Sequence, residues 1–348
     1  MFYRVIGLMS GTSLDGLDIA YCEFDKQNDR WTFEIKEAET VRYDDKMRDK
    51  IRSMETASAD ELSEFSVELG HYFGRMTRKF IEKKNLTVDF VSSHGQTIFH
   101  RPDKHYTTQI GDISAICAEV KTTCVGDFRS MDVALGGQGA PLVPIGDRLL
   151  FSEYDCCLNL GGFSNISYEK NGKRTAYDIC ACNMVLNHLA EEKGFACDEG
   201  GAIAASGKRD KTLLTALNSL PFYKSRKAKS LGKEWVVENI FPLLQQSGLG
   251  IADKLCTYTH HIAEQILVHL KGRTLVTGGG SYNRFLTDML RKSQKSSIEI
   301  PDKIIIDYKE ALIFAFLGVL RMRNQANCLS SVTGAKQDSC CGLVVQWI

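Results

Sequence analysis

The chain has 348 residues, of which 43% are hydrophobic and 25% are charged, and its 43 Lys and Arg side chains balance its 43 Asp and Glu side chains. This is the composition of a globular protein that is too long for one comfortable core, so we expect two domains. The balanced charge argues against a nucleic-acid-binding protein, and the longest apolar run, residues 311–320, is too short to span a membrane. We therefore expect a small-molecule partner, no nucleic acid and no membrane.

The N-terminus and the cysteines indicate a cytoplasmic protein. Arg4 interrupts the apolar start of the chain, so no secretion signal is visible. None of the 12 cysteines forms a Cys-x-x-Cys pair, and we interpret them as reduced thiols that mostly fill apolar space.

The first predicted element is a hairpin of two strands. An apolar run at residues 5–8 enters its turn, and Leu17, Ile19 and Tyr21 leave it at every second position. The turn combines glycines, hydroxyls and carboxylates, which together suit a polyphosphate that is bound with Mg²⁺. These residues are Ser10, Gly11, Thr12, Ser13, Asp15, Gly16 and Asp18. The same residue types are also typical of an ordinary polar turn, and the turn alone supports both interpretations.

The rest of the first half alternates between strands and helices. The pattern predicts strands over residues 31–43, 88–92 and 122–125, and helices over residues 58–84, 112–119 and 143–151. A Ser58-x-x-Glu61 capping box starts the long helix. Two polar clusters, at residues 93–97 and 126–129, directly follow predicted strands. Because open α/β sheets bind ligands beyond the carboxyl ends of their strands, we expect a binding site there.

From Cys156 onwards the chain resembles a second copy of its opening. Two predicted strands, over residues 157–160 and 166–169, are joined by a glycine-rich turn at residues 161–165. This repeat indicates two related domains, residues 1–145 and 146–348, that face each other across a nucleotide cleft.

The second half also contains candidate catalytic and nucleotide-binding segments. A third strand, over residues 174–179, carries Asp178 near its end, and a helix over residues 183–192 follows. A buried strand over residues 274–277 ends in three consecutive glycines, which permit a flat or charged ligand to approach the backbone. Further helices are predicted over residues 213–220, 235–244, 255–270 and 309–323.

The chain lacks a P-loop, the protein-kinase motifs and a Rossmann fingerprint after its first strand. Along its whole length it resembles the anhydro-N-acetylmuramic acid kinases of the actin/hexokinase/Hsp70 superfamily. The string at residues 7–18 is similar to the opening signature of that family. Further similar strings follow in order at residues 93–97, 109–112, 126–129, 136–144, 158–165, 277–283 and 331–335. The resemblance implies an α/β fold of two RNase H-like domains around a central nucleotide cleft.

The resemblance also implies a reaction in peptidoglycan recycling. An ATP-dependent kinase of this family hydrolytically opens 1,6-anhydro-N-acetylmuramic acid and phosphorylates O6, which gives N-acetylmuramic acid 6-phosphate and ADP. The implied cofactors are ATP and Mg²⁺. The metal would be bound through ATP, with Asp15 or Asp18 reaching it through water, and no direct ligand is assigned. A homodimer is compatible with this assignment.

The resemblance also implies site residues, at the positions of this chain that match the family motifs. Asp178 matches the general base of the family, and the alternative is that it caps the following helix. The matching sugar-binding positions are His94, Gln96, Asp127, Arg129 and Glu310. Each of them could instead brace a loop, while Arg129 suits a lactyl carboxylate or a phosphate. The matching nucleotide-binding positions are Gly11, Thr12, Ser13, Leu14, Asp15, Gly16, Leu17, Asp18, Gly161, Gly162, Gly278, Gly279, Gly280 and Asn283.

The sequence departs from the family pattern near the base. The family commonly shows Asp-Thr-Gly-Pro-x-Asn, whereas this chain has Asp178-Ile179-Cys180-Ala181-Cys182-Asn183. A Lys-Ser-x-Gly-x-Glu string is present at residues 229–234, with Lys227-Ala228 where prolines are usual. Two alternative functions stay open: another sugar or acetate-type kinase of the same superfamily, and a nucleotide-dependent binding or chaperone module like the Hsp70 ATPase domain.

Overall fold

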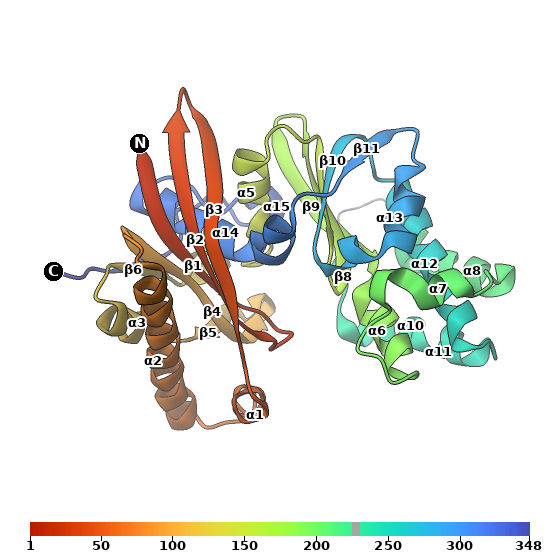
Figure 1. The fold of residues 1–348 in the computed structure, drawn as a ribbon, viewed down its shortest axis with the longest axis horizontal. Helices are drawn as coiled ribbons and strands as arrows, with labels where there is room; N and C mark the ends of the chain where they lie inside the picture. Colours follow the sequence, from red (N-terminus) through yellow and green to blue (C-terminus); the bar gives the residue numbers. More distant parts are fainter. Residues whose placement is uncertain (225–229) are drawn as a thin grey trace. The chain divides into compact units, whose positions relative to one another are not determined.

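The computed structural model describes residues 1–224 and 230–348. The chain divides into two compact units (Figure 1). The first unit consists of Met1–Leu150 and Tyr308–Ile348, and the second consists of Phe151–Asp307. Lys227 and Ala228, which depart from the family pattern, and Lys229, which begins the family string at residues 229–234, lie outside the described residues.

The first unit contains a sheet with the strand order β12-β6-β4-β1-β2-β3, and β5 pairs with β4 (Figure 1). The antiparallel strands are β1 (Phe2–Ser10), β2 (Gly16–Gln27) and β3 (Arg30–Arg42). The parallel partners that follow are β4 (Phe90–Arg101) beside β1 and β6 (Cys124–Gly126) beside β4. The sheet is completed by β5 (Tyr106–Ile110) and β12 (Leu343–Val345), both antiparallel to their neighbours.

The second unit repeats this topology with the order β11-β10-β7-β8-β9. Its antiparallel strands are β7 (Cys156–Leu160), β8 (Phe163–Lys170) and β9 (Lys173–Ala181). Its parallel strands are β10 (Gly272–Thr277) and β11 (Ser296–Glu299). In both units the first three strands form a meander, and the next two central strands run parallel to the first. This is the strand arrangement of an RNase H-like domain, so the predicted fold of two related α/β units is confirmed. The short strand β11 was not predicted.

Helices of the first unit bury their apolar faces against its sheet. The longest, α2 (Ala59–Lys84), begins with the predicted capping box, in which Glu61 N donates to Ser58 Oγ at 3.2 Å and Ser58 N donates to Glu61 Oε2 at 2.8 Å. Its buried residues include Phe65, Leu69 and Phe73, which belong to the same core as β1 and β4. The other helices are α1 (Asp45–Ser53), η1 (Pro102–Lys104), α3 (Ile113–Val120), α4 (Ser130–Ala134), α5 (Val143–Leu150) and α15 (Ser330–Thr333).

The second unit has a separate core around α12 (Ile251–Leu267), whose Leu255, Tyr258 and Ile262 are fully buried. The other helical elements are α6 (Asn183–Glu191), η2 (Glu199–Gly201), α7 (Ala202–Ser206), α8 (Lys211–Asn218), α9 (Pro221–Lys224), α10 (Lys233–Asn239), α11 (Phe241–Gln246), η3 (Gly279–Tyr282) and α13 (Arg284–Arg291). The single helix predicted over residues 235–244 is wrong, because α10 ends before α11 begins. Pro242 supplies no backbone N–H and fits only the first turn of a new helix.

The C-terminal segment packs differently from the prediction. Helix α14 (Lys303–Met322) starts earlier than expected, and the division between the units falls within it, after Asp307. Beyond that point α14 packs closely on the first sheet: Ser92 Oγ donates to the carbonyl of Phe314 at 2.6 Å, and a Cβ on Gly7 would lie 2.0 Å from the carbonyl oxygen of Ala311. Strand β12 then pairs with β6. These contacts join residues 308–348 to the first unit, so their placement in the second domain is corrected.

None of the helices in the described part of the chain combines the length and the apolar composition that crossing a bilayer requires.

Candidate functional site

The turn between β1 and β2 is shorter than predicted. It consists of residues 11–15, and Gly16, Leu17 and Asp18 already belong to β2. The side chains of Thr12, Ser13 and Asp15 are exposed, whereas those of Leu14 and Leu17 are buried in the core. Any contact of Leu14 or Leu17 with a phosphate would therefore have to come from the backbone, and this part of the assignment stays a prediction.

Two glycines of this turn serve different purposes. A Cβ on Gly16 would lie 2.4 Å from the carbonyl oxygen of Val41, so pairing with β3 requires glycine there. Gly11 has open space, since the nearest atom to a Cβ would be Ser13 Oγ at 3.7 Å. Packing within the protein therefore explains Gly16, and it does not explain Gly11. Asp18 is braced from β3 by Thr40, whose hydroxyl donates to Asp18 Oδ1 at 2.6 Å.

In the second unit, the structure brings together two of the predicted nucleotide-binding segments. Gly161 and Gly162 form the whole connection between β7 and β8, because residues 163–165 belong to β8. Gly278, which follows β10, approaches this hairpin so closely that a Cβ would lie 2.4 Å from Asn159 Oδ1. A Cβ on Gly280 would lie 2.8 Å from Leu160 Cβ, whereas at Gly279 the nearest atom would be 3.8 Å away. Gly278 and Gly280 thus permit the close approach, and Gly279 faces open space.

Asn183 links these segments and was not among the predicted site residues. Its backbone N–H donates to the carbonyl of Gly161 at 3.1 Å, and its Nδ2 donates to the carbonyl of Leu160 at 2.9 Å. A Cβ on Gly280 would lie 2.9 Å from Asn183 Oδ1, so the glycine segment packs against this side chain. The start of α6 therefore holds the hairpin and the glycine segment side by side. The spacing between Asp178 and Asn183, which matches the family string, was the sequence signal that could have identified Asn183.

The Gly200-Gly201 pair was also missed. Both residues have positive φ, of 62° and 76°, and Asp198 fixes the following turn by accepting from Ile203 N at 2.7 Å and Ala204 N at 2.9 Å. A Cβ on Gly201 would lie 2.2 Å from Asn283 Oδ1. Asn283 itself caps α13 by accepting from Leu286 N at 3.0 Å. Asn283 thus has a structural role at the edge of this segment, and its contact with adenosine stays a prediction.

Asp178 lies within β9 and does not cap the following helix. The N-cap of α6 is Cys182, which makes no side-chain capping bond, so the alternative interpretation of Asp178 is wrong. Instead, Asp178 Oδ2 accepts from Leu231 N at 2.9 Å and from Ser230 Oγ at 3.3 Å. Burial raises the pKa of the Asp178 carboxyl, and these two hydrogen bonds act in the opposite direction. A half-buried carboxylate that is oriented through one oxygen suits a general base.

The predicted cluster at residues 93–97 lies inside β4, and its placement beyond a strand end is corrected. The strand continues to Arg101 because β5 returns along it and pairs with it from Gln96 to Arg101. Gly95 interrupts the regular extended backbone with a φ of 74°. A Cβ there would lie 2.7 Å from the carbonyl oxygen of Ile110. The irregular backbone at Gly95 directly follows His94.

His94 positions Arg129. The imidazole is only 5% exposed. Because a guanidinium can only donate, His94 Nε2 must accept from Arg129 Nε at 3.0 Å and from Arg129 Nη2 at 2.9 Å. His94 Nδ1 lies 2.9 Å from the carbonyl oxygen of Gly95 and therefore carries the proton. Burial lowers the pKa of His94 well below its usual value, with a further contribution from the positive charge of Arg129, so the ring is neutral.

Arg129 is a partly desolvated cation that uses only some of its N–H groups in hydrogen bonds to these protein groups. Its Nη1 donates to the carbonyl of Gly139 at 2.6 Å, and two further N–H groups point to His94, so these bonds use three of its five donors. Burial lowers the pKa of Arg129 to about 10, while the negative charge of Glu310 acts in the opposite direction. The side chain stays charged at neutral pH. Because water solvates it poorly, an anion that binds here gains more than at an open surface.

The other predicted sugar-binding residues have varied environments. Gln96 is 1% exposed and accepts from Ser10 Oγ at 2.6 Å, so it braces the end of β1. Asp127 adopts a φ of 57° and accepts from Ser130 N at 3.2 Å, which starts α4. Glu310 lies in α14 with an exposed side chain. Gln96 and Asp127 thus have structural partners within the first unit, and Arg129, Glu310 and Asp127 are the charged members of the predicted set.

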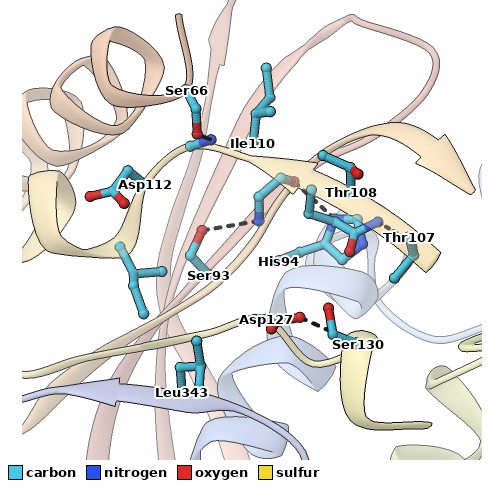
Figure 2. A pocket seen from close by; sticks show the side chains of 14 residues that line it. Ser66, Ser93, His94, Thr107, Thr108, Ile110, Asp112, Asp127, Ser130 and Leu343 are labelled. Atoms are coloured by element: carbon cyan, nitrogen blue, oxygen red, sulfur yellow. Dashed lines mark hydrogen bonds between the residues drawn. The ribbon is translucent and has the colours of Figure 1, made fainter. Parts of the chain in front are cut away.

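A polar pocket of about 250 Å³ opens beside His94 (Figure 2). It is lined by β4, β5, the start of α3 and the segment that leads into α4. Its polar side chains include Ser93, His94, Thr107, Gln109, Asp112 and Asp127. Two predicted sugar-site residues, His94 and Asp127, thus share this pocket, whereas Gln96, Arg129 and Glu310 do not line it.

No group of three or more His, Cys, Asp and Glu side chains arranged to hold a metal is found in residues 1–224 and 230–348. The exposed Asp15 and the half-buried Asp18 are the carboxylates that flank the first turn. They fit a metal that is held mainly by a ligand and reached through water, rather than one bound directly by the protein.

The comparisons with known proteins agree with one another. A family model described as anhydro-N-acetylmuramic acid kinase matches residues 3–346. A protein of that name from Mannheimia succiniciproducens is 36% identical, over 97% of this chain and 98% of the relative. Another of that name from Bacillus thuringiensis is 32% identical, over 96% of this chain and 97% of the relative.

Proposed function

The chain belongs to the anhydro-N-acetylmuramic acid kinase family, and we propose that it uses ATP to phosphorylate O6 of 1,6-anhydro-N-acetylmuramic acid while water opens the anhydro bridge. The products are N-acetylmuramic acid 6-phosphate and ADP, and the reaction belongs to cytoplasmic peptidoglycan recycling. The substrate assignment rests on the environment of the Arg129 guanidinium. Its two remaining N–H groups on a desolvated guanidinium suit the lactyl carboxylate, which separates muramic acid from other amino sugars.

Asp178 is the proposed general base. Leu231 N and Ser230 Oγ orient its carboxylate, and its raised pKa makes it a better proton acceptor. As the water oxygen forms a bond to C1, one water proton passes to Asp178 and the bond between C1 and O6 breaks. The released O6 forms a bond to the γ-phosphorus of ATP, and ADP leaves.

The two hairpin turns are the proposed phosphate-binding elements. Gly11 in the first unit and Gly162 in the second have open space where a Cβ would be, so a phosphate can approach their backbone N–H groups. Thr12 and Ser13 add exposed hydroxyl donors. Mg²⁺, which would offset the phosphate charge when bound with ATP, would be reached through water by Asp15 or Asp18.

The glycine segment after β10 is the proposed adenosine-binding element. Gly278 and Gly280 are explained by packing against the hairpin of the second unit, whereas Gly279 has no close neighbour. The backbone at Gly279 would therefore be accessible to a flat purine. Gly201 lies against Asn283 in the same segment, and Gly200 next to it also has open space.

A sugar-dependent ATP turnover assay tests the proposal. We expect 1,6-anhydro-N-acetylmuramic acid to stimulate ADP release, with N-acetylmuramic acid 6-phosphate as product. Stimulation by sugars that carry a free 6-hydroxyl, with no response to the anhydro sugar, would instead favour another sugar kinase. Stimulation by a peptide, with no phosphorylated sugar, would favour a chaperone module.

A further inference from the structure

Asp132 in α4 is a fully buried carboxylate that lies outside the residues assigned above. Its exposed fraction is 0%. Thr333 Oγ1 donates to its Oδ1 at 2.7 Å, the thiol of Cys328 donates to the same oxygen at 3.1 Å, and Gly139 N donates to Oδ2 at 2.7 Å. A buried carboxylate is tolerated only when such donors replace water. Both oxygens of Asp132 therefore have defined partners.

The glycine-rich segment at residues 136–139 wraps around this carboxylate. Gly137 N donates to the backbone carbonyl of Asp132 at 2.9 Å, and a Cβ on Gly137 would lie 2.2 Å from Asp132 Oδ2. Gly139 has a φ of 65°, which favours glycine. The segment thus has the small residues that allow it to close tightly on Asp132.

Gly139 connects Asp132 with Arg129. Its N–H donates to Asp132 Oδ2 at 2.7 Å, and its carbonyl accepts from Arg129 Nη1 at 2.6 Å. The other side of the same guanidinium is held by His94. Of the two groups that orient Arg129, one is therefore a side chain and the other is a backbone carbonyl whose position depends on Asp132.

We propose that Asp132 is a positioning residue for Arg129. By holding Gly139, it directs the two remaining N–H groups of Arg129 toward the carboxylate of the substrate, and so it contributes to the preference for an anionic sugar. This inference rests on the proposed role of Arg129. It predicts that loss of Asp132 weakens the binding of a sugar that carries a lactyl group more than the binding of the same sugar without one.

The test compares the dissociation constants of 1,6-anhydro-N-acetylmuramic acid and 1,6-anhydro-N-acetylglucosamine, measured by titration calorimetry on the full chain. The ratio of the two constants does not depend on the fraction of folded protein, so a purely structural role leaves it unchanged. We expect Asp132→Ala to reduce the preference for the muramic sugar by about tenfold or more, because small displacements of a binding group are costly.

Two further variants sharpen the test. In Asp132→Asn, the amide oxygen can still accept from Gly139 N when the amide nitrogen faces Thr333. The hydroxyl of Thr333 can then accept from that nitrogen, because it can donate instead to the carbonyl of Leu329, 3.3 Å away. We expect Asp132→Asn to restore most of the preference. Thr333→Val removes one donor to Asp132 and keeps the bond between Asp132 and Gly139, so the preference should stay within about twofold of the wild type. If Asp132→Ala cannot be purified, Asp132→Ser, which is too short to replace the acceptor, takes its place.

The outcomes separate this inference from the proposed function. If Arg129→Met lowers the preference and the variants that lose the carboxylate of Asp132 do not, Asp132 only stabilises the fold and the inference is wrong. If Arg129→Met leaves the preference unchanged, the role of Arg129 itself fails. An equal loss in Thr333→Val and Asp132→Ala would also contradict the inference.

Discussion

The imidazole of His94 accepts two hydrogen bonds from the guanidinium of Arg129, at 3.0 Å from Nε and 2.9 Å from Nη2. This pairing requires a neutral ring, and burial of His94 lowers its pKa accordingly. The neutral histidine therefore orients the guanidinium of Arg129 without neutralising its positive charge. It leaves Arg129 without a charged hydrogen-bond partner among these contacts, so the carboxylate of a ligand can fill that role.

The first prediction concerns this pair. His94→Phe removes the acceptor for Arg129 and should raise the KM for the anhydro sugar by about tenfold or more, since a lost hydrogen bond to a charged group costs about 1.5–3 kcal/mol. His94→Gln keeps a neutral acceptor and should raise KM less. The KM for ATP should stay unchanged in both variants. Equal sugar KM values in His94→Phe and the wild type would show that His94 does not position Arg129.

The second prediction concerns Asp178. Asp178→Asn should lower turnover by about 10²- to 10⁴-fold and leave ATP affinity nearly unchanged, because an amide of similar shape cannot accept the proton of water. In the wild type, activity should fall with decreasing pH, at a pH above the usual pKa of an aspartate, because burial raises the pKa of Asp178. Ser230→Ala removes a hydrogen bond that favours the carboxylate, so it should move this fall to higher pH. Near-wild-type turnover in Asp178→Asn would contradict the assignment.

The third prediction uses the two open glycines. Gly11→Val and Gly279→Val should weaken ATP binding while the protein remains folded, because neither Cβ would contact the protein closer than 3.7 Å and 3.8 Å, respectively. Gly250→Val is the matched control, since it also has open space and lies in an exposed turn before α12. Gly280→Val should instead reduce stability, because a Cβ there would lie 2.8 Å from Leu160 Cβ. Calorimetric ATP titration with melting temperatures separates these effects, and an unchanged ATP affinity in folded Gly279→Val would remove Gly279 from the site.

The fourth prediction is a pH dependence of stability in the second unit. His261 is fully buried, and burial lowers its pKa to about 3. The unfolded chain takes up this proton below about pH 6.5, whereas the folded chain does so only near pH 3. Between these values the unfolded state holds more protons, so the free energy of unfolding falls as pH decreases, by up to about 1.4 kcal/mol per pH unit. His261→Gln should lose less stability than the wild type between pH 7 and pH 5 in urea unfolding. Identical losses would contradict the buried neutral state.

Much of the fold could be predicted from local patterns. The alternation of Leu17, Ile19 and Tyr21 identified β2, and the spacing of Phe65, Leu69 and Phe73 identified α2, because both patterns reflect burial of one face. The return of the C-terminal segment to the first unit was not predictable in this way. It depends on long-range contacts such as that between Gly7 and Ala311, and no local pattern contains such a contact.

The candidate site shows the same limit. The position of Asp178 near the end of a strand was correctly predicted from the strand pattern of residues 174–179. The partners of Asp178 lie more than 50 residues away, at Ser230 and Leu231, and could not be inferred. Likewise, the match to the family motif indicated His94 as a sugar-site residue, but its bond to Arg129, which spans 35 positions of the sequence, could not be inferred. Residue types and motifs thus indicate the chemistry of a site, and only the tertiary structure shows which partners each group has.

The last prediction concerns the stereochemistry of ring opening. In the anhydro sugar the bridge oxygen occupies the β face of C1, so water that is activated by Asp178 must attack from the opposite face, as in an inverting glycosidase. The first product should therefore be the α anomer, seen by NMR before mutarotation. In ¹⁸O-labelled water the label should appear at C1 and be absent from the phosphoryl group, since O6 comes from the substrate. Initial β product would mean that water does not displace the bridge oxygen directly from the opposite face, and label in the phosphate of the sugar product would mean that water attacks phosphorus. The general-base role of Asp178 would then be wrong even if Asp178→Asn is inactive, which makes this experiment independent of the mutational one.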